Sequence, residues 1–91
     1  MAFVQVSKAK GMTKGTFDRL RRAWIGEGLL DGMLFVVGGP GEDGWYLVEG
    51  WKSRPHCEAA MEKLIQALNQ LQIDLPELTE EEFDLDYQRL G

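Results

Sequence analysis

The sequence has few of the residues that hold small proteins together through covalent bonds or metal ions. It contains one cysteine, Cys57, and one histidine, His56. A single cysteine excludes an intrachain disulfide, and this pair falls short of the four ligands that a structural zinc site needs. The fold must therefore depend on a hydrophobic core, and we expect neither a metal ion nor a cofactor.

Long apolar runs and an excess of basic residues are also missing. No apolar run approaches the roughly 20 residues that cross a bilayer, and the chain does not open with a signal-peptide pattern. We therefore expect a cytoplasmic protein with no membrane partner. Ten basic residues against 15 acidic ones give a net charge of -5, which repels a phosphate backbone, so no nucleic-acid partner is expected.

What the sequence does have is the composition of a folded domain. Hydrophobic residues make up 44% of the chain and charged residues 27%, a balance typical of globular proteins rather than disordered ones. A chain of 91 residues has room for one hydrophobic core. We expect a single domain over residues 1–91.

Two helices are predicted by apolar side chains that recur at helical spacing. Thr13 can cap the first helix and Gly26 can end it. The apolar side chains of this helix are Phe17, Leu20, Trp24 and Ile25. Ser53 can cap the second helix through its hydroxyl. The apolar side chains that follow are Cys57, Met61, Leu64, Leu68 and Leu71.

Four strands are predicted by segments rich in β-branched and aromatic residues or by alternation of acidic and apolar residues. They cover residues 3–8, 33–37, 45–51 and 82–87. The connector 38–44 consists of glycine, proline and acidic residues, which predicts a hairpin loop between two antiparallel strands. It lacks the lysine and hydroxyl of a phosphate-binding loop, so no nucleotide site is expected.

The resulting order, β-α-β-β-α-β, predicts an α+β fold of the ferredoxin-like type, with a four-stranded antiparallel sheet and both helices on one face. Both faces of the central strands are apolar, yet two helices can cover only one of them. An uncovered apolar face of this size marks an association site. We therefore expect a homodimer whose sheets pack face to face through Phe35, Val37, Trp45 and Leu47.

Several short segments carry a resemblance to a known family. They are Gly11-Met12-Thr13, the stretch from Leu29 to Pro40, Gly44-Trp45 and the run from Val48 to Ser53. These segments resemble the dimeric α+β barrel superfamily, which includes the antibiotic biosynthesis monooxygenase (ABM) domains. The resemblance implies a dimer whose two sheets form a barrel, with a pocket between sheet and helices in each subunit.

The same resemblance implies a range of activities. Some relatives oxidise polycyclic aromatic compounds without a cofactor, and others degrade haem. The haem-degrading relatives use a histidine on the second helix, where the interior of this helix offers Ala59, Ala60 and Met61. Haem degradation is therefore not expected.

The candidate site consists of aromatic side chains and two titratable groups. Trp24, Phe35, Tyr46 and Trp51 can line a cavity for a small aromatic ligand, or they can form only core and dimer interface. His56 titrates nearest neutrality and Glu49 stands among aromatic residues, so these are the candidate catalytic groups. Either can instead be a surface or salt-bridged residue. Cys57 is interpreted as a small buried side chain rather than a nucleophile.

These features leave the function open between classes. The first hypothesis is a homodimeric domain that binds a small apolar or aromatic ligand between sheet and helices. The alternative is a cofactor-free ABM-like monooxygenase that acts on an aromatic or polyketide-type substrate, which the resemblance alone supports. An RNA-recognition module shares the element order but needs exposed aromatic residues in a basic surface, whereas this chain is acidic.

Overall fold

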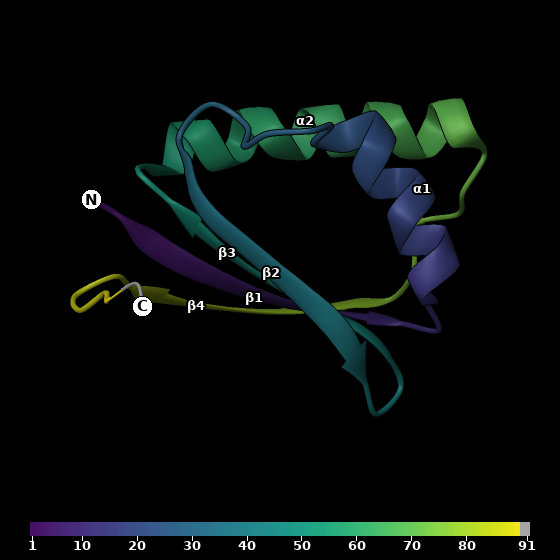
Figure 1. The fold of residues 1–91 in the computed structure, drawn as a ribbon, viewed down its shortest axis with the longest axis horizontal. Coiled ribbons are helices and arrows are strands. Elements are labelled where there is room, and N and C mark those ends of the chain that lie inside the picture. Colours follow the sequence, from purple (N-terminus) through teal and green to yellow (C-terminus); the bar gives the residue numbers. More distant parts are fainter. Residues whose placement is uncertain (90–91) are drawn as a thin grey trace.

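A computed structural model describes residues 1–89 of the chain, and its elements follow in the predicted order (Figure 1). The strands are β1 (Phe3–Lys10), β2 (Met33–Gly41), β3 (Gly44–Trp51) and β4 (Leu78–Asp84), and the helices are α1 (Lys14–Trp24) and α2 (Arg54–Leu71). The strands form one antiparallel sheet in the order β2-β3-β1-β4. The predicted α+β ferredoxin-like fold is therefore confirmed.

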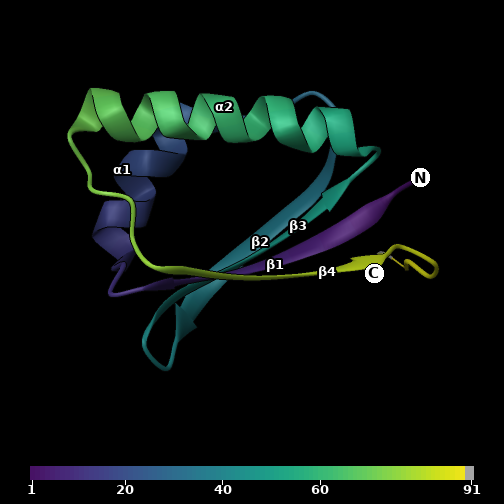
Figure 2. The same cartoon turned by 180° about the vertical axis from the view of Figure 1, so that it is seen from behind.

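Both helices lie on one side of the sheet, and no helix of the described chain covers the other side (Figures 1 and 2). α2 runs across the sheet, and α1 is tied to it by the Trp24 indole, which donates to the Ala60 carbonyl at 2.9 Å. One cluster of buried core residues contains Phe3, Met33, Trp51, Cys57 and Ala60, and a second contains Leu20, Trp24, Ala67 and Leu68. Neither described helix is long and apolar enough to cross a membrane.

The ends of the helices follow the sequence signals in part. The Thr13 hydroxyl accepts from the Thr16 amide at 3.2 Å, which confirms the predicted cap of α1, and Gly26 closes this helix with a positive φ of 77°. Ser53 precedes α2 as predicted, but its hydroxyl makes no capping bond among the described residues. It lies 2.7 Å from Nδ1 of His56 instead, so the expected hydroxyl cap is wrong.

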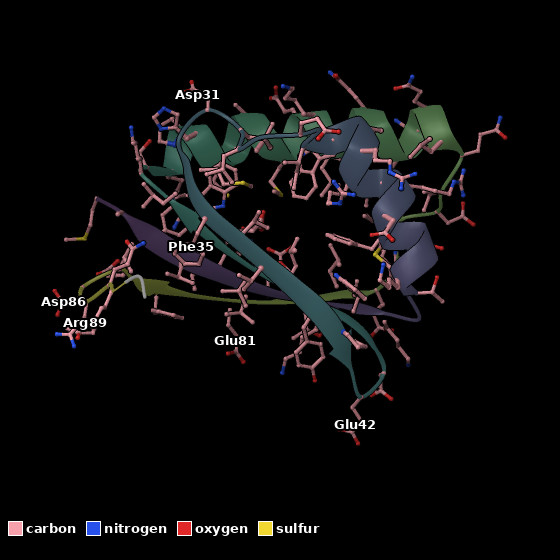
Figure 3. All side chains as sticks on the ribbon, viewed as in Figure 1. Asp31, Phe35, Glu42, Glu81, Asp86 and Arg89 are labelled. Carbon is pink, nitrogen blue, oxygen red and sulfur yellow. The ribbon has the colours of Figure 1, made fainter. Side chains whose placement is uncertain are left out.

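Two strand boundaries also differ from the prediction. β2 continues through Gly41, so the expected loop over 38–44 shrinks to a turn at Glu42 and Asp43. Figure 3 shows Glu42 at the tip of this hairpin. β4 covers Leu78–Asp84 rather than 82–87, because its backbone pairs with β1 along an acidic stretch that has no alternation of acidic and apolar residues. All seven residues of β4 are exposed.

The strand register assigns each residue to one face of the sheet, because directly paired antiparallel residues point to the same side. Val37 pairs with Val48, Val48 with Val6, and Val6 with Glu81. Figure 3 shows Glu81 pointing away from the helices. We call this side the open face, and its apolar members are Val4, Val6, Phe35, Val37, Tyr46, Val48 and Phe83.

The register corrects the expected interface set. Phe35 and Val37 lie on the open face, as a surface for association requires. Trp45 and Leu47 lie on the helix-facing side, where Trp45 is buried and stacks on Phe17 at 4.9 Å between ring centroids. The four residues therefore do not share one surface. A β-bulge between Met33 and Phe35 also turns Met33 toward the helices, although simple alternation placed it with Phe35.

Candidate functional site

A cavity of about 60 Å³ lies between the helix-facing side of the sheet and the two helices. Its walls are mostly apolar and include Phe17, Leu20, Trp24, Leu47, Leu64 and Leu68. Leu75 and Pro76, which precede β4, and Leu78, its first residue, also belong to the lining, and Leu75 and Leu78 are exposed. An engineered cavity that holds benzene has about 150 Å³, so this one accommodates only a few non-hydrogen atoms in its present form.

The acidic side chain of Glu49, from the second half of β3, belongs to the lining of this cavity. Only 1% of its surface is exposed, and its Oε2 atom has no hydrogen-bond partner within residues 1–89. Burial raises the pKa of Glu49 to about 7, and the nearby charge of Glu80 raises it further in the same direction. A carboxyl group whose pKa lies near neutrality can both accept and release a proton at pH 7, which suits acid–base chemistry or ligand recognition.

A short hydrogen-bond chain runs beside Glu49. Gln5, its partner residue on β1, is buried and donates from Nε2 to Glu80 Oε2 at 2.6 Å. The Cys57 thiol donates to Gln5 Oε1 at 3.4 Å. Burial raises the pKa of Cys57 to about 11, and the charge of Glu49 adds to this effect. The thiol is therefore protonated at neutral pH, in agreement with its interpretation as a buried side chain rather than a nucleophile.

The second candidate group, His56, lies in a different place. Its ring is near the start of α2, where Nδ1 faces the Ser53 hydroxyl and Nε2 lies 3.8 Å from Asp31 Oδ2. Figure 3 shows Asp31 on the loop above this end of α2. His56 contributes to a shallow hollow with Leu30 and Lys63 and is not among the residues that line the cavity. The structure thus separates the two titratable candidates.

The four aromatic candidates are also divided. Trp24 lines the cavity. Trp51 is fully buried in the first core cluster and does not reach the described cavity walls. Phe35 and Tyr46 lie on the open face. The four residues therefore do not form one binding site, because the sheet itself lies between them.

Sequence reasoning missed two residues of the site, Gln5 and Glu80, and gave Trp45 a different role. Trp45 lines the cavity, and its Nε1 atom has no hydrogen-bond partner in the part of the chain that the structure describes. Glu80 lies outside the strand expected over 82–87, so the face of the sheet to which it points could not be predicted. The polar residue Gln5 within an apolar strand was the available signal.

No three His, Cys, Asp or Glu side chains of residues 1–89 come together as a metal site. The sequence was also compared with models of protein families and with curated proteins, and nothing matches in either comparison.

Proposed function

We propose that this chain is a small homodimeric protein of the dimeric α+β barrel type that binds a small apolar or aromatic ligand in the cavity between sheet and helices. The observation that carries the proposal is the unpartnered Oε2 atom of Glu49 at the wall of an otherwise largely apolar cavity. Buried polar atoms without partners are rare in folded proteins and cost free energy. A ligand that hydrogen-bonds to Glu49 offsets that cost.

We place this protein in the cytoplasm.

The open face supports the homodimer. Val37 and Phe83 are 59% and 56% exposed, and both lie on this face with the partly buried Val6 and Val48. A second copy of the sheet would cover these side chains and remove their apolar surface from water. Face-to-face packing of two sheets leaves both helix layers outside, so each subunit keeps its own cavity.

A cofactor-free monooxygenase is the second candidate, and Glu49 is the observation that favours it. Such an enzyme needs a base that removes a proton from an aromatic substrate, so that the substrate itself can react with oxygen. A carboxyl group with a pKa of about 7 suits that role at neutral pH. We rank this candidate second because a cavity of about 60 Å³ is too small for a polycyclic substrate.

A thermal-shift screen of small apolar and aromatic compounds tests the proposal. Binding to the folded state should raise the melting temperature. Leu64→Phe, which fills the cavity, should abolish the increase, whereas Ile65→Phe, at the next position and 54% exposed, should keep it. Circular dichroism establishes that both variants fold. A panel without any stabilising compound, or equal stabilisation of both variants, would contradict the proposal.

A further inference from the structure

The charges at the cavity are all of one sign. Glu49 and Glu80 both belong to its lining, and the described lining contains no lysine, arginine or histidine. These two acids come from the two strands that flank β1. Glu49 on β3 pairs with Gln5, and Glu80 on β4 pairs with Ser7, which lies two residues further along β1. The acidic groups therefore gather at one end of the cavity, whereas Trp45, Ala9 and Leu78 lie toward the other end.

Arg54, whose charge acts on Cys57 together with those of Glu49 and Glu80, does not neutralise this end. Arg54 is held by Glu82, which accepts from Arg54 Nη1 at 3.3 Å and also accepts from Nη2. Glu80 receives only the neutral Gln5 amide among the hydrogen bonds of the described chain, and Glu49 Oε2 receives none there. The described lining thus holds two carboxyl groups and no cation, and the charge of Glu80 adds to the effect of burial in raising the pKa of Glu49.

We infer that the ligand of this cavity is a small primary amine, bound as its ammonium ion, with the ammonium group at Glu49 and Glu80 and a short apolar group against the remaining walls. The inference rests on the proposed function and names its ligand class. An ammonium ion supplies donors for the unpartnered Glu49 oxygen and compensates both carboxylates, whereas a neutral acceptor would leave the Glu80 charge as it is.

The volume limits the size of this amine. A cavity of about 60 Å³ accepts a few carbon atoms beside the ammonium group. Isobutylamine, isobutanol and isobutyrate provide a matched set of probes, because they have similar branched skeletons and end in a cation, a neutral hydroxyl and an anion. Their binding to the full chain at pH 8 can be followed by two-dimensional ¹H–¹⁵N NMR titration.

We expect isobutylamine to bind about tenfold more tightly than isobutanol, since charge-assisted hydrogen bonds are stronger than neutral ones. The amide signals of cavity residues such as Leu47 and Leu64 should move. Glu49→Gln and Glu80→Gln should each reduce the affinity for the amine toward that for the alcohol. Glu81→Gln, next to Glu80 but on the open face, is the matched control for the general negative charge and should leave binding unchanged.

The affinity for the amine should also fall as the pH drops from 8 to 6, because a proton then competes with the ammonium ion for Glu49. The groups near Glu49 are Glu80 on β4, the protonated Cys57 thiol on α2 and the neutral Gln5 on β1. No titratable group of α1 is among the described lining residues. Glu49→Gln should remove most of this pH dependence.

The outcomes separate this inference from the proposed function. Equal binding of amine and alcohol, or tightest binding of isobutyrate, would overturn the amine assignment and leave ligand binding intact. An equal loss of affinity in Glu81→Gln would show general attraction to an acidic surface and would also overturn it. If none of these probes binds and no compound of the wider screen binds, the proposed function fails as well.

Discussion

The ring of Phe35 lies over Gly50, its partner residue on β3. A Cβ atom added at Gly50 would overlap the ring atoms Cε2 and Cδ2, so a side chain at this position requires Phe35 to move. Glycine here leaves room for the aromatic ring to approach the backbone of β3 closely.

Gly50→Ala should therefore destabilise the protein by about 1–3 kcal/mol, the usual cost of inserting a methyl group into a packed site. Urea unfolding at a fixed protein concentration measures the difference. Gly39→Ala is the matched control, because Gly39 also lies on the open face and an added Cβ there meets no atom within 4 Å. If both variants lose the same free energy of unfolding, the close contact between Phe35 and Gly50 is not the cause.

The buried carboxyl of Glu49 should make stability depend on pH. Its pKa is about 7 in the folded chain and near 4.5 when solvated, so the folded state binds the extra proton between these values. Stability from this group is fully present below pH 4.5 and is lost as the pH rises to about 7, by a total on the order of 3 kcal/mol.

Glu49→Gln should remove this pH dependence, because glutamine carries no titrating proton. The free energy of unfolding, measured at pH 5 and pH 8, should fall less in Glu49→Gln than in the unmodified chain. Glu81→Gln should behave like the unmodified chain. A steep loss of stability in Glu49→Gln over the same range would assign the effect to another group.

Val37→Glu should convert the proposed homodimer into a monomer, because it places a charge on the open face beside Val48. Sedimentation velocity should show twice the chain mass for the unmodified protein and the mass of one chain for the variant. Ile65→Glu tests a similarly exposed position on α2, with exposed fractions of 54% for Ile65 and 59% for Val37, and should remain dimeric. A monomeric unmodified chain would refute the dimer.

Trp24→Phe should cost more than Trp45→Phe, although both remove the same pyrrole ring. The Trp24 indole donates to Ala60 on α2, whereas the Trp45 indole lacks a partner within the described residues. The difference should be about 1–2 kcal/mol, the value of a buried hydrogen bond with its orphaned acceptor. Urea unfolding measures it, and equal losses would mean that the Trp24 bond contributes nothing to the pairing of α1 with α2.

The fold could be predicted from the sequence because the helical stripes, the β-rich runs and the glycine-containing connector act locally. The side of the sheet to which each strand residue points could not be predicted, because it depends on how the strands pair. The turn at Glu42 and Asp43 places Gly41 opposite Gly44, so odd-numbered residues of β2 share a face with even-numbered residues of β3. The expected interface combined odd-numbered residues of both strands, and this one-residue difference moved Trp45 and Leu47 to the wrong side.

The candidate site was predictable only at Glu49 and Trp24. Glu49 was conspicuous as an acid within an apolar strand, and Trp24 lies on the buried stripe of α1. Glu80 belongs to the site because β4 pairs with β1, and the sequence pattern of β4 does not predict this pairing. His56 was chosen as a candidate because histidine titrates nearest neutrality. This property does not determine where its side chain lies in the fold.

The exposure of β4 bears on how a ligand reaches the cavity. This strand is attached through backbone bonds to β1 and buries none of its own side chains, so its amide protons should exchange with solvent before those of β1. Leu78 and Glu80 belong to it and also to the cavity wall. Fraying of β4 would move that wall and would let small molecules enter and leave the cavity.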